Sequence, residues 1–174
     1  MKHIILVGFK SVGKSTVGRQ LAKHLDLPFI DSDFAIADLH AAMTGKKSSC
    51  REIMREQGAD YFRALETEAL QKVLSVNPPV VIAVGGGAPM SACNQTLLKN
   101  HTVVHITAPK GAVFERIMLN GRPAFFPADV DPYSSFQKIW SERNPIYEKL
   151  ATLTVENGRS LDETVANLAV KIHL

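Results

Sequence analysis

The sequence lacks a long hydrophobic run and carries little net charge. Its longest apolar stretches, Ile4–Gly8 and Val80–Val84, are far shorter than the ~20 residues that a membrane-spanning helix needs. The 20 basic and 17 acidic residues leave a net charge of +3. That excess is too small to favour nucleic acid or an anionic membrane as the main partner. We therefore expect no nucleic acid and no membrane among the partners.

Cysteine is scarce, and histidine shows no metal-binding spacing. The two cysteines, Cys50 and Cys93, lie far apart and outside any C-x-x-C pattern. They could form one disulfide or remain two separate thiols, and buried or incidental thiols are the plainer interpretation. The stretch Lys2–Val7 has only four apolar residues before a glycine, fewer than the core of a signal peptide. We expect a cytoplasmic protein.

Apolar runs alternate with stretches of helical period along the 174 residues, which suit one domain spanning residues 1–174. The β-branched runs predict strands, each covered on both faces, at Ile4–Val7, Pro28–Ile30, Val80–Val84, Val103–Ile106 and Leu153–Val155. Helices are expected at Lys14–Leu25, Ala64–Leu74, Ala92–Leu98, Ala112–Leu119, Phe136–Leu150 and Leu161–Ile172. This alternation predicts an α/β fold, an open parallel sheet with helices on both faces. Ligands of such sheets bind beyond the carboxyl ends of the strands.

A phosphate-binding motif follows the first predicted strand. The segment Gly8-Phe9-Lys10-Ser11-Val12-Gly13-Lys14-Ser15 matches G-x-x-x-x-G-K-[ST], with a strand before it and a helix after it. Its glycines let backbone N–H groups approach phosphate oxygens at the positive end of a helix. Lys14 is expected to reach the β- and γ-phosphates, and Ser15 to reach Mg²⁺. The motif predicts binding of a nucleoside triphosphate.

Two further segments follow strands at the same edge. Asp31 and Asp33 would share one side of an extended chain, where one carboxylate could hold Mg²⁺ and the other orient or deprotonate an acceptor hydroxyl. The alternative is an aspartate that caps the next helix. Gly85-Gly86-Gly87 allows either a substrate to lie against the backbone or a tight turn into a helix.

Three arginines and one irregular segment complete the candidates. Arg63, Arg122 and Arg143 carry the planar fork that suits carboxylate and phosphate, although a single arginine on a helix usually faces solvent. Gly121–Tyr133 holds three prolines and shows little periodicity. Such a long connection is either a mobile lid or an ordinary surface loop.

Taken together, these segments resemble the shikimate kinases, small P-loop enzymes of aromatic amino-acid biosynthesis. Six matches occur in family order over almost the whole chain: Gly8–Thr16, Asp31-Ser32-Asp33, Phe62-Arg63-Ala64-Leu65-Glu66, Gly85-Gly86-Gly87, Arg122-Pro123 and Arg143-Asn144-Pro145-Ile146-Tyr147. The resemblance implies a three-layer P-loop kinase fold whose five parallel strands have the order 2-3-1-4-5. It also implies an acceptor-binding region at about residues 33–63 and a lid at about residues 120–133.

The resemblance further implies transfer of the ATP γ-phosphate to the 3-hydroxyl of shikimate, with Mg²⁺ as cofactor. Lys14, Asp33 and Arg122 would be catalytic, with Asp33 holding the acceptor hydroxyl. The ATP site would comprise Gly8, Ser11, Val12, Gly13, Lys14, Ser15, Thr16, Arg116 and Arg122. Ser15 and Asp31 would arrange the metal. The shikimate site would comprise Asp33, Arg63, Gly85, Gly86, Gly87 and Arg143, with Glu66 orienting Arg63.

The chain also departs from the family pattern and leaves alternatives open. The stretch from Asp33 to Arg63 is several residues longer than usual, through added helix expected near Asp38–Met43. Because this stretch helps to form the acceptor pocket, another small-molecule kinase, such as a gluconate kinase, is one alternative. A nucleotide-binding module without kinase activity is the other. We expect a monomer.

Overall fold

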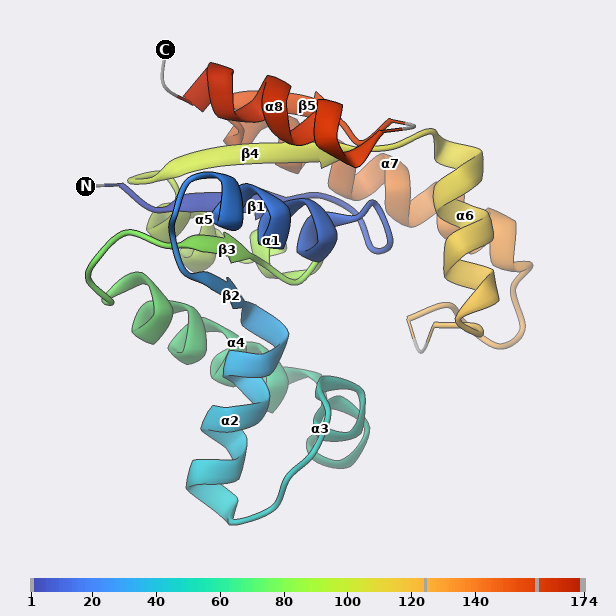
Figure 1. The fold of residues 1–174 in the computed structure, drawn as a ribbon. Coiled ribbons are helices and arrows are strands. Elements are labelled where there is room, and N and C mark those ends of the chain that lie inside the picture. Colours follow the sequence, from blue (N-terminus) through green and yellow to red (C-terminus); the bar gives the residue numbers. More distant parts are fainter. Residues whose placement is uncertain (1, 124, 159, 173–174) are drawn as a thin grey trace.

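A computed structural model describes residues 2–123, 125–158 and 160–172. Within these residues lies one parallel sheet with the strand order β2-β3-β1-β4-β5, which confirms the predicted fold. The strands are β1 (Ile4–Val7), β2 (Phe29–Asp31), β3 (Val81–Ala83), β4 (Thr102–Thr107) and β5 (Leu153–Glu156). Helices α1 and α8 lie on one face of the sheet, and α5 and α7 lie on the other (Figure 1).

Every predicted helix is present, with some boundaries shifted. The helices are α1 (Lys14–His24), α2 (Ser32–Thr44), α3 (Cys50–Gln57), α4 (Ala59–Leu74), α5 (Ala92–Leu98), α6 (Lys110–Leu119), α7 (Pro132–Leu150) and α8 (Leu161–Ile172). A 3₁₀ turn, η1, spans Ala88–Met90. The sequence analysis missed η1 and α3, and it expected only the second half of α2. Helix α7 begins four residues before the expected Phe136, so Tyr133 is helical.

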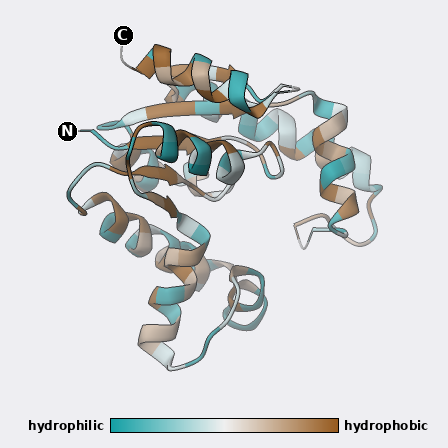
Figure 2. Ribbon diagram, viewed as in Figure 1, coloured by the Kyte–Doolittle hydropathy of each residue, from teal (hydrophilic) through white to brown (hydrophobic). Residues whose placement is uncertain are grey.

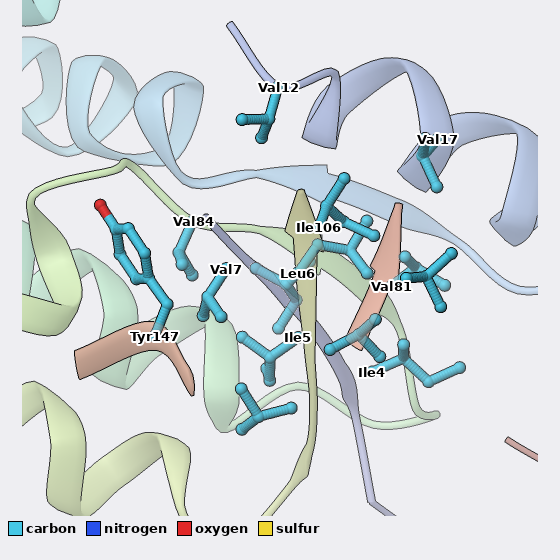
Figure 3. Close-up of a cluster of buried hydrophobic side chains, with 14 of the residues drawn as sticks. Ile4, Ile5, Leu6, Val7, Val12, Val17, Val81, Val84, Ile106 and Tyr147 are labelled. Atoms are coloured by element: carbon cyan, nitrogen blue, oxygen red, sulfur yellow. The ribbon is translucent and has the colours of Figure 1, made fainter. Parts of the chain in front are cut away.

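The core forms where the central strands are covered on both sides. All four residues of β1 and all three of β3 are buried, because α1 and α8 cover one face and α5 and α7 the other (Figure 1). The strands are correspondingly hydrophobic in Figure 2, and Figure 3 shows the β1 side chains and Val81 of β3 within the buried cluster. The expectation of two covered faces is wrong for β5. In this edge strand only Val155 is buried, whereas Thr154 and Glu156, which point to the opposite face of the sheet, are exposed.

A separate subdomain lies beyond the β2 edge. Helices α2 and α3 pack against α4 around a small second core of Ile36, Ile53, Phe62, Leu65 and Ala69. This subdomain corresponds to the expected acceptor-binding region and projects from the sheet in Figure 1. In the part of the chain that is described, no helix has both the length and the apolar character to cross a membrane.

Candidate active site

The phosphate loop lies between β1 and α1, as its sequence predicts. Gly8 has a φ of +143°, and a Cβ atom there would lie 2.3 Å from the Ile106 carbonyl oxygen, so only glycine fits. The Lys14 Nζ atom donates to the carbonyl oxygens of Gly8 (3.0 Å) and Phe9 (2.8 Å). Burial lowers the pKa of Lys14 to about 8, although Asp33 and Asp31 oppose this effect.

Asp31 links the loop to the second strand. Its carboxylate accepts a hydrogen bond from Ser15 Oγ (2.6 Å) and another from the backbone N–H of Asp33 (3.1 Å). Asp31 is therefore the N-cap of α2. The helix-capping alternative is correct, and it coexists with a position beside the phosphate loop. The expectation of an extended chain through Asp33 is wrong, because the cap places Asp33 in the first turn of α2.

The chemistry of Asp31 and Ser15 fits a magnesium nucleotide. Their adjacent oxygens are the hard donors that Mg²⁺ prefers, and Mg²⁺ commonly takes its remaining ligands from phosphates and water. Among the described residues, no three His, Cys, Asp or Glu side chains gather as a metal site, so the protein alone supplies few ligands. Asp33 stands next to this pair, and its pKa is raised by desolvation and by the charge of Asp31. A raised pKa makes its carboxylate a better proton acceptor.

The three glycines form a turn after β3. The backbone N–H of Gly85 donates to Ser32 Oγ (2.9 Å), and η1 begins directly after the turn. A Cβ atom at Gly87 would lie 2.6 Å from Arg63 Nη2. The turn alternative is therefore correct, and the missing side chain also makes room for the Arg63 guanidinium. Arg63 donates to Glu66 (2.6 Å), the predicted partner one helical turn later.

The phosphate loop, the Gly85–Gly87 turn and the subdomain of α2, α3 and α4 together line one cavity of about 780 Å³. The predicted residues that line it are Ser11, Lys14, Ser15, Asp31, Asp33, Arg63, Gly85, Gly86, Gly87, Arg122 and Arg143. Five others do not line it: Gly8, Val12, Gly13, Thr16 and Arg116. Arg116 instead reaches the outer side of the phosphate loop, where Nη1 lies 3.5 Å from the Ser11 carbonyl oxygen. Asn157, which sequence reasoning missed, holds the loop by donating to the Val12 carbonyl (2.9 Å).

Helix α3 supplies four of the cavity-lining residues that the sequence analysis missed. Cys50 and Met54, and likewise Arg51 and Arg55, are spaced four apart and line the cavity together, as neighbours on one helix face do. The available signal was the pattern Ser49-x-x-Glu52, which forms a capping box at the start of α3. Within the described residues, both cysteines are free, and burial raises the pKa of Cys50 to about 12.

The segment between α6 and α7 contributes Arg122 and an aromatic ring. Arg122 lines the cavity, but its guanidinium donates to the carbonyl oxygens of Pro127 and Val130 within the same segment. The Arg143 guanidinium lies 5.9 Å from the ring centroid of Phe9 and 5.4 Å from that of Phe125. Arg143 thus stands between the phosphate loop and this segment, at a distance where cation–π attraction operates.

The fold and the loop geometry define a P-loop nucleotide-binding α/β protein. Comparison with known proteins narrows this class, because the family model for shikimate kinase matches residues 10–173. The chain belongs to the shikimate kinase family. It is 37% identical to shikimate kinase of Neisseria gonorrhoeae (strain ATCC 700825 / FA 1090) over 97% of this chain and 95% of that protein. It is 34% identical to that of Rhodococcus jostii (strain RHA1), over 97% and 96%.

Solved structures agree with this assignment. Shikimate kinase from Acinetobacter baumannii in complex with shikimate matches with a TM-score of 0.82 and 30% identity, over 99% of this chain and 91% of that one. The Aquifex aeolicus enzyme matches with a TM-score of 0.79 and 28% identity, over 98% and 96%. A gluconokinase from Sinorhizobium meliloti has a TM-score of 0.60 at 20% identity, over 99% and 95%, which shows a shared fold alone.

Proposed function

We propose that this chain transfers the γ-phosphate of ATP to the 3-hydroxyl of shikimate, a step in aromatic amino-acid biosynthesis. The observation that carries the proposal is the content of the cavity: Lys14, Asp33 and two arginines, Arg63 and Arg143, line the same space. A small acceptor with one carboxylate and several hydroxyls needs arginine for the first and a carboxylate for the second. Family membership supports the same substrate.

In the proposed reaction, the acceptor hydroxyl oxygen forms the new bond to the γ-phosphorus while the bond to the β,γ-bridging oxygen breaks. Asp33 holds the hydroxyl and takes its proton, which its raised pKa favours. Lys14 is proposed to exchange its loop carbonyls for phosphate oxygens and to stabilise the charge on the transferring group. Arg122 would join it from the lid, after leaving the carbonyls of Pro127 and Val130.

Arg63 and Arg143 are proposed to bind the shikimate carboxylate, and the turn Gly85–Gly87 to carry the ring. Ser15 and Asp31 would hold Mg²⁺, which supplies charge neutralisation at the phosphates when bound. Gly8, Ser11, Val12, Gly13, Thr16 and Arg116 remain the proposed ATP contacts. We further propose that the enzyme acts as a cytoplasmic monomer, for which its two free thiols suit a reducing compartment.

The proposal is tested by measuring ADP release from MgATP with shikimate, with gluconate or with no acceptor. Strong stimulation by shikimate alone is the expected result. Stimulation by gluconate would support the alternative acceptor, and stimulation by neither, with ATP still bound, would support a nucleotide-binding module. In both of these cases the added residues before Arg63, expected near Asp38–Met43 in α2, would be the first to examine.

A further inference from the structure

A buried phenol contacts the glycine turn without lining the cavity. Tyr147 in α7 is fully buried, and its hydroxyl donates a hydrogen bond to the Gly86 carbonyl oxygen. Figure 3 shows its ring beside Val7 and Val84, with the hydroxyl directed away from the aliphatic side chains. The bond joins residues 61 positions apart, so it fixes the turn relative to a helix that is remote in sequence.

Gly86 also lies directly against the phosphate loop. A Cβ atom at Gly86 would be 3.4 Å from the Gly8 carbonyl oxygen, 3.4 Å from the Lys10 backbone nitrogen and 3.6 Å from the Tyr147 hydroxyl oxygen. The same Gly8 carbonyl accepts a hydrogen bond from Lys14 Nζ (3.0 Å). Only the space of one missing Cβ atom therefore separates Gly86 from the loop backbone that binds Lys14.

The surroundings of the phenol keep it a hydrogen-bond donor. Burial raises the pKa of Tyr147 to about 12, so the hydroxyl stays protonated at neutral pH. The His105 ring lies 5.5 Å from the Tyr147 ring, and burial lowers the pKa of His105, which keeps that neighbour neutral. The Arg143 guanidinium also lies near the phenol and opposes the rise in its pKa, and the protonated hydroxyl donates to the Gly86 carbonyl.

We propose that Tyr147 is a positioning residue, which sets the distance between the glycine turn that carries the acceptor and the loop that carries the γ-phosphate. The inference rests on the proposed function. Phosphoryl transfer depends on the alignment of its reacting groups, and a displacement of about 1 Å can cost about 100-fold in rate. Because Tyr147 does not line the cavity, its loss should disturb the alignment and leave both substrates bound.

The test uses Tyr147→Phe, which keeps the ring and removes only the donor. We expect kcat to fall about 10- to 100-fold, with the KM for ATP and for shikimate each within about twofold of the wild type. The matched control is Thr164→Val, which removes another buried hydroxyl that donates to a backbone carbonyl, that of Ser160, on the far face of the sheet. It should leave kcat unchanged. If Tyr147→Phe changes only stability or KM, the proposal is overturned.

Amide hydrogen exchange in the ligand-free protein gives a second measurement that needs no activity. Loss of the bond should accelerate exchange in residues 84–88 of Tyr147→Phe, and Thr164→Val should leave that segment unchanged. If the wild-type enzyme does not phosphorylate shikimate, the proposed function is wrong. The role of Tyr147 in positioning the turn is then tested by amide hydrogen exchange alone. Unchanged exchange in that case would overturn the inference.

Discussion

The guanidinium of Arg63 lies 2.6 Å from the carboxylate of Glu66, one turn further along α4. The Glu66 side chain is only 4% exposed, whereas that of Arg63 is 39% exposed toward the cavity. Burial raises the pKa of Glu66, and Arg63 opposes that rise. The Arg63 Nη1 atom is therefore held by Glu66, and the rest of the guanidinium is left to bind a ligand.

Removal of an acceptor-binding arginine should weaken use of the acceptor. We expect Arg63→Ala and Arg143→Ala each to lower kcat/KM for shikimate by roughly 30- to several-thousand-fold, since the loss of one partner of a desolvated charged hydrogen bond costs about 2–5 kcal/mol. Steady-state kinetics at saturating ATP measures the effect. Lys72→Ala is the control, because Lys72 belongs to an exposed ion pair of the same helix, with Glu68 at 3.1 Å. Wild-type kinetics in both arginine variants would remove the carboxylate assignment.

A methyl group at Gly87 should produce a related defect while Arg63 itself is not mutated. In Gly87→Ala the new Cβ would meet the Arg63 guanidinium at 2.6 Å, so the arginine must move away from the turn. We expect a KM for shikimate at least tenfold higher, with the affinity for ATP unchanged. Gly111→Ala is the matched control, because open space surrounds Gly111 in α6. Equal KM values for the two variants would show that the turn does not place Arg63.

The carboxylate of Asp33 should be needed for transfer and not for nucleotide binding. Asp33→Asn keeps the shape and removes the proton acceptor, so we expect phosphoryl transfer to be abolished while ATP affinity is nearly unchanged. Turnover and equilibrium binding of ATP together test this prediction. Asp38→Asn, an exposed aspartate of the same helix, serves as control. Wild-type turnover in Asp33→Asn would make the assigned role wrong.

The lowered pKa of Lys14, about 8 in the ligand-free protein, predicts a basic limb in the pH profile. Below pH 8 the ammonium is charged and attracts the phosphates. Above pH 8 it loses its proton, so kcat/KM for ATP, which reports the free enzyme, should decline. A profile from pH 6 to 10 measures the limb. A flat profile up to pH 10 would show that Lys14 keeps its charge.

The sequence predicted the sheet well because its strands are short apolar runs between strong signals. Helices α5 and α8 have the predicted boundaries. Ser91 caps the start of α5, and α8 buries Val165, Leu168 and Ala169 at helical spacing. Helix α3 was missed because it is short: its eight residues make little more than two turns, with Ile53 as the buried side chain.

The candidate site was predictable where residues follow strands and unpredictable where distant helices meet. Lys14, Asp31 and Gly87 follow three different strands, and parallel topology brings those strand ends together. Their neighbours Arg51 and Phe125 reach the cavity from α3 and from the segment after α6. No local sequence pattern predicts that these distant residues line the same cavity, because their proximity depends on how the subdomain packs against the sheet. The link from Tyr147 to Gly86 is of the same kind.

The central claim is that shikimate is the phosphoryl acceptor at its 3-hydroxyl. The most direct measurement is NMR of the product formed from MgATP and shikimate by the purified wild-type protein. The account predicts a phosphate ester at the 3-hydroxyl, formed in equal amount to ADP. Release of inorganic phosphate with unmodified shikimate, or an ester at another hydroxyl, would contradict it.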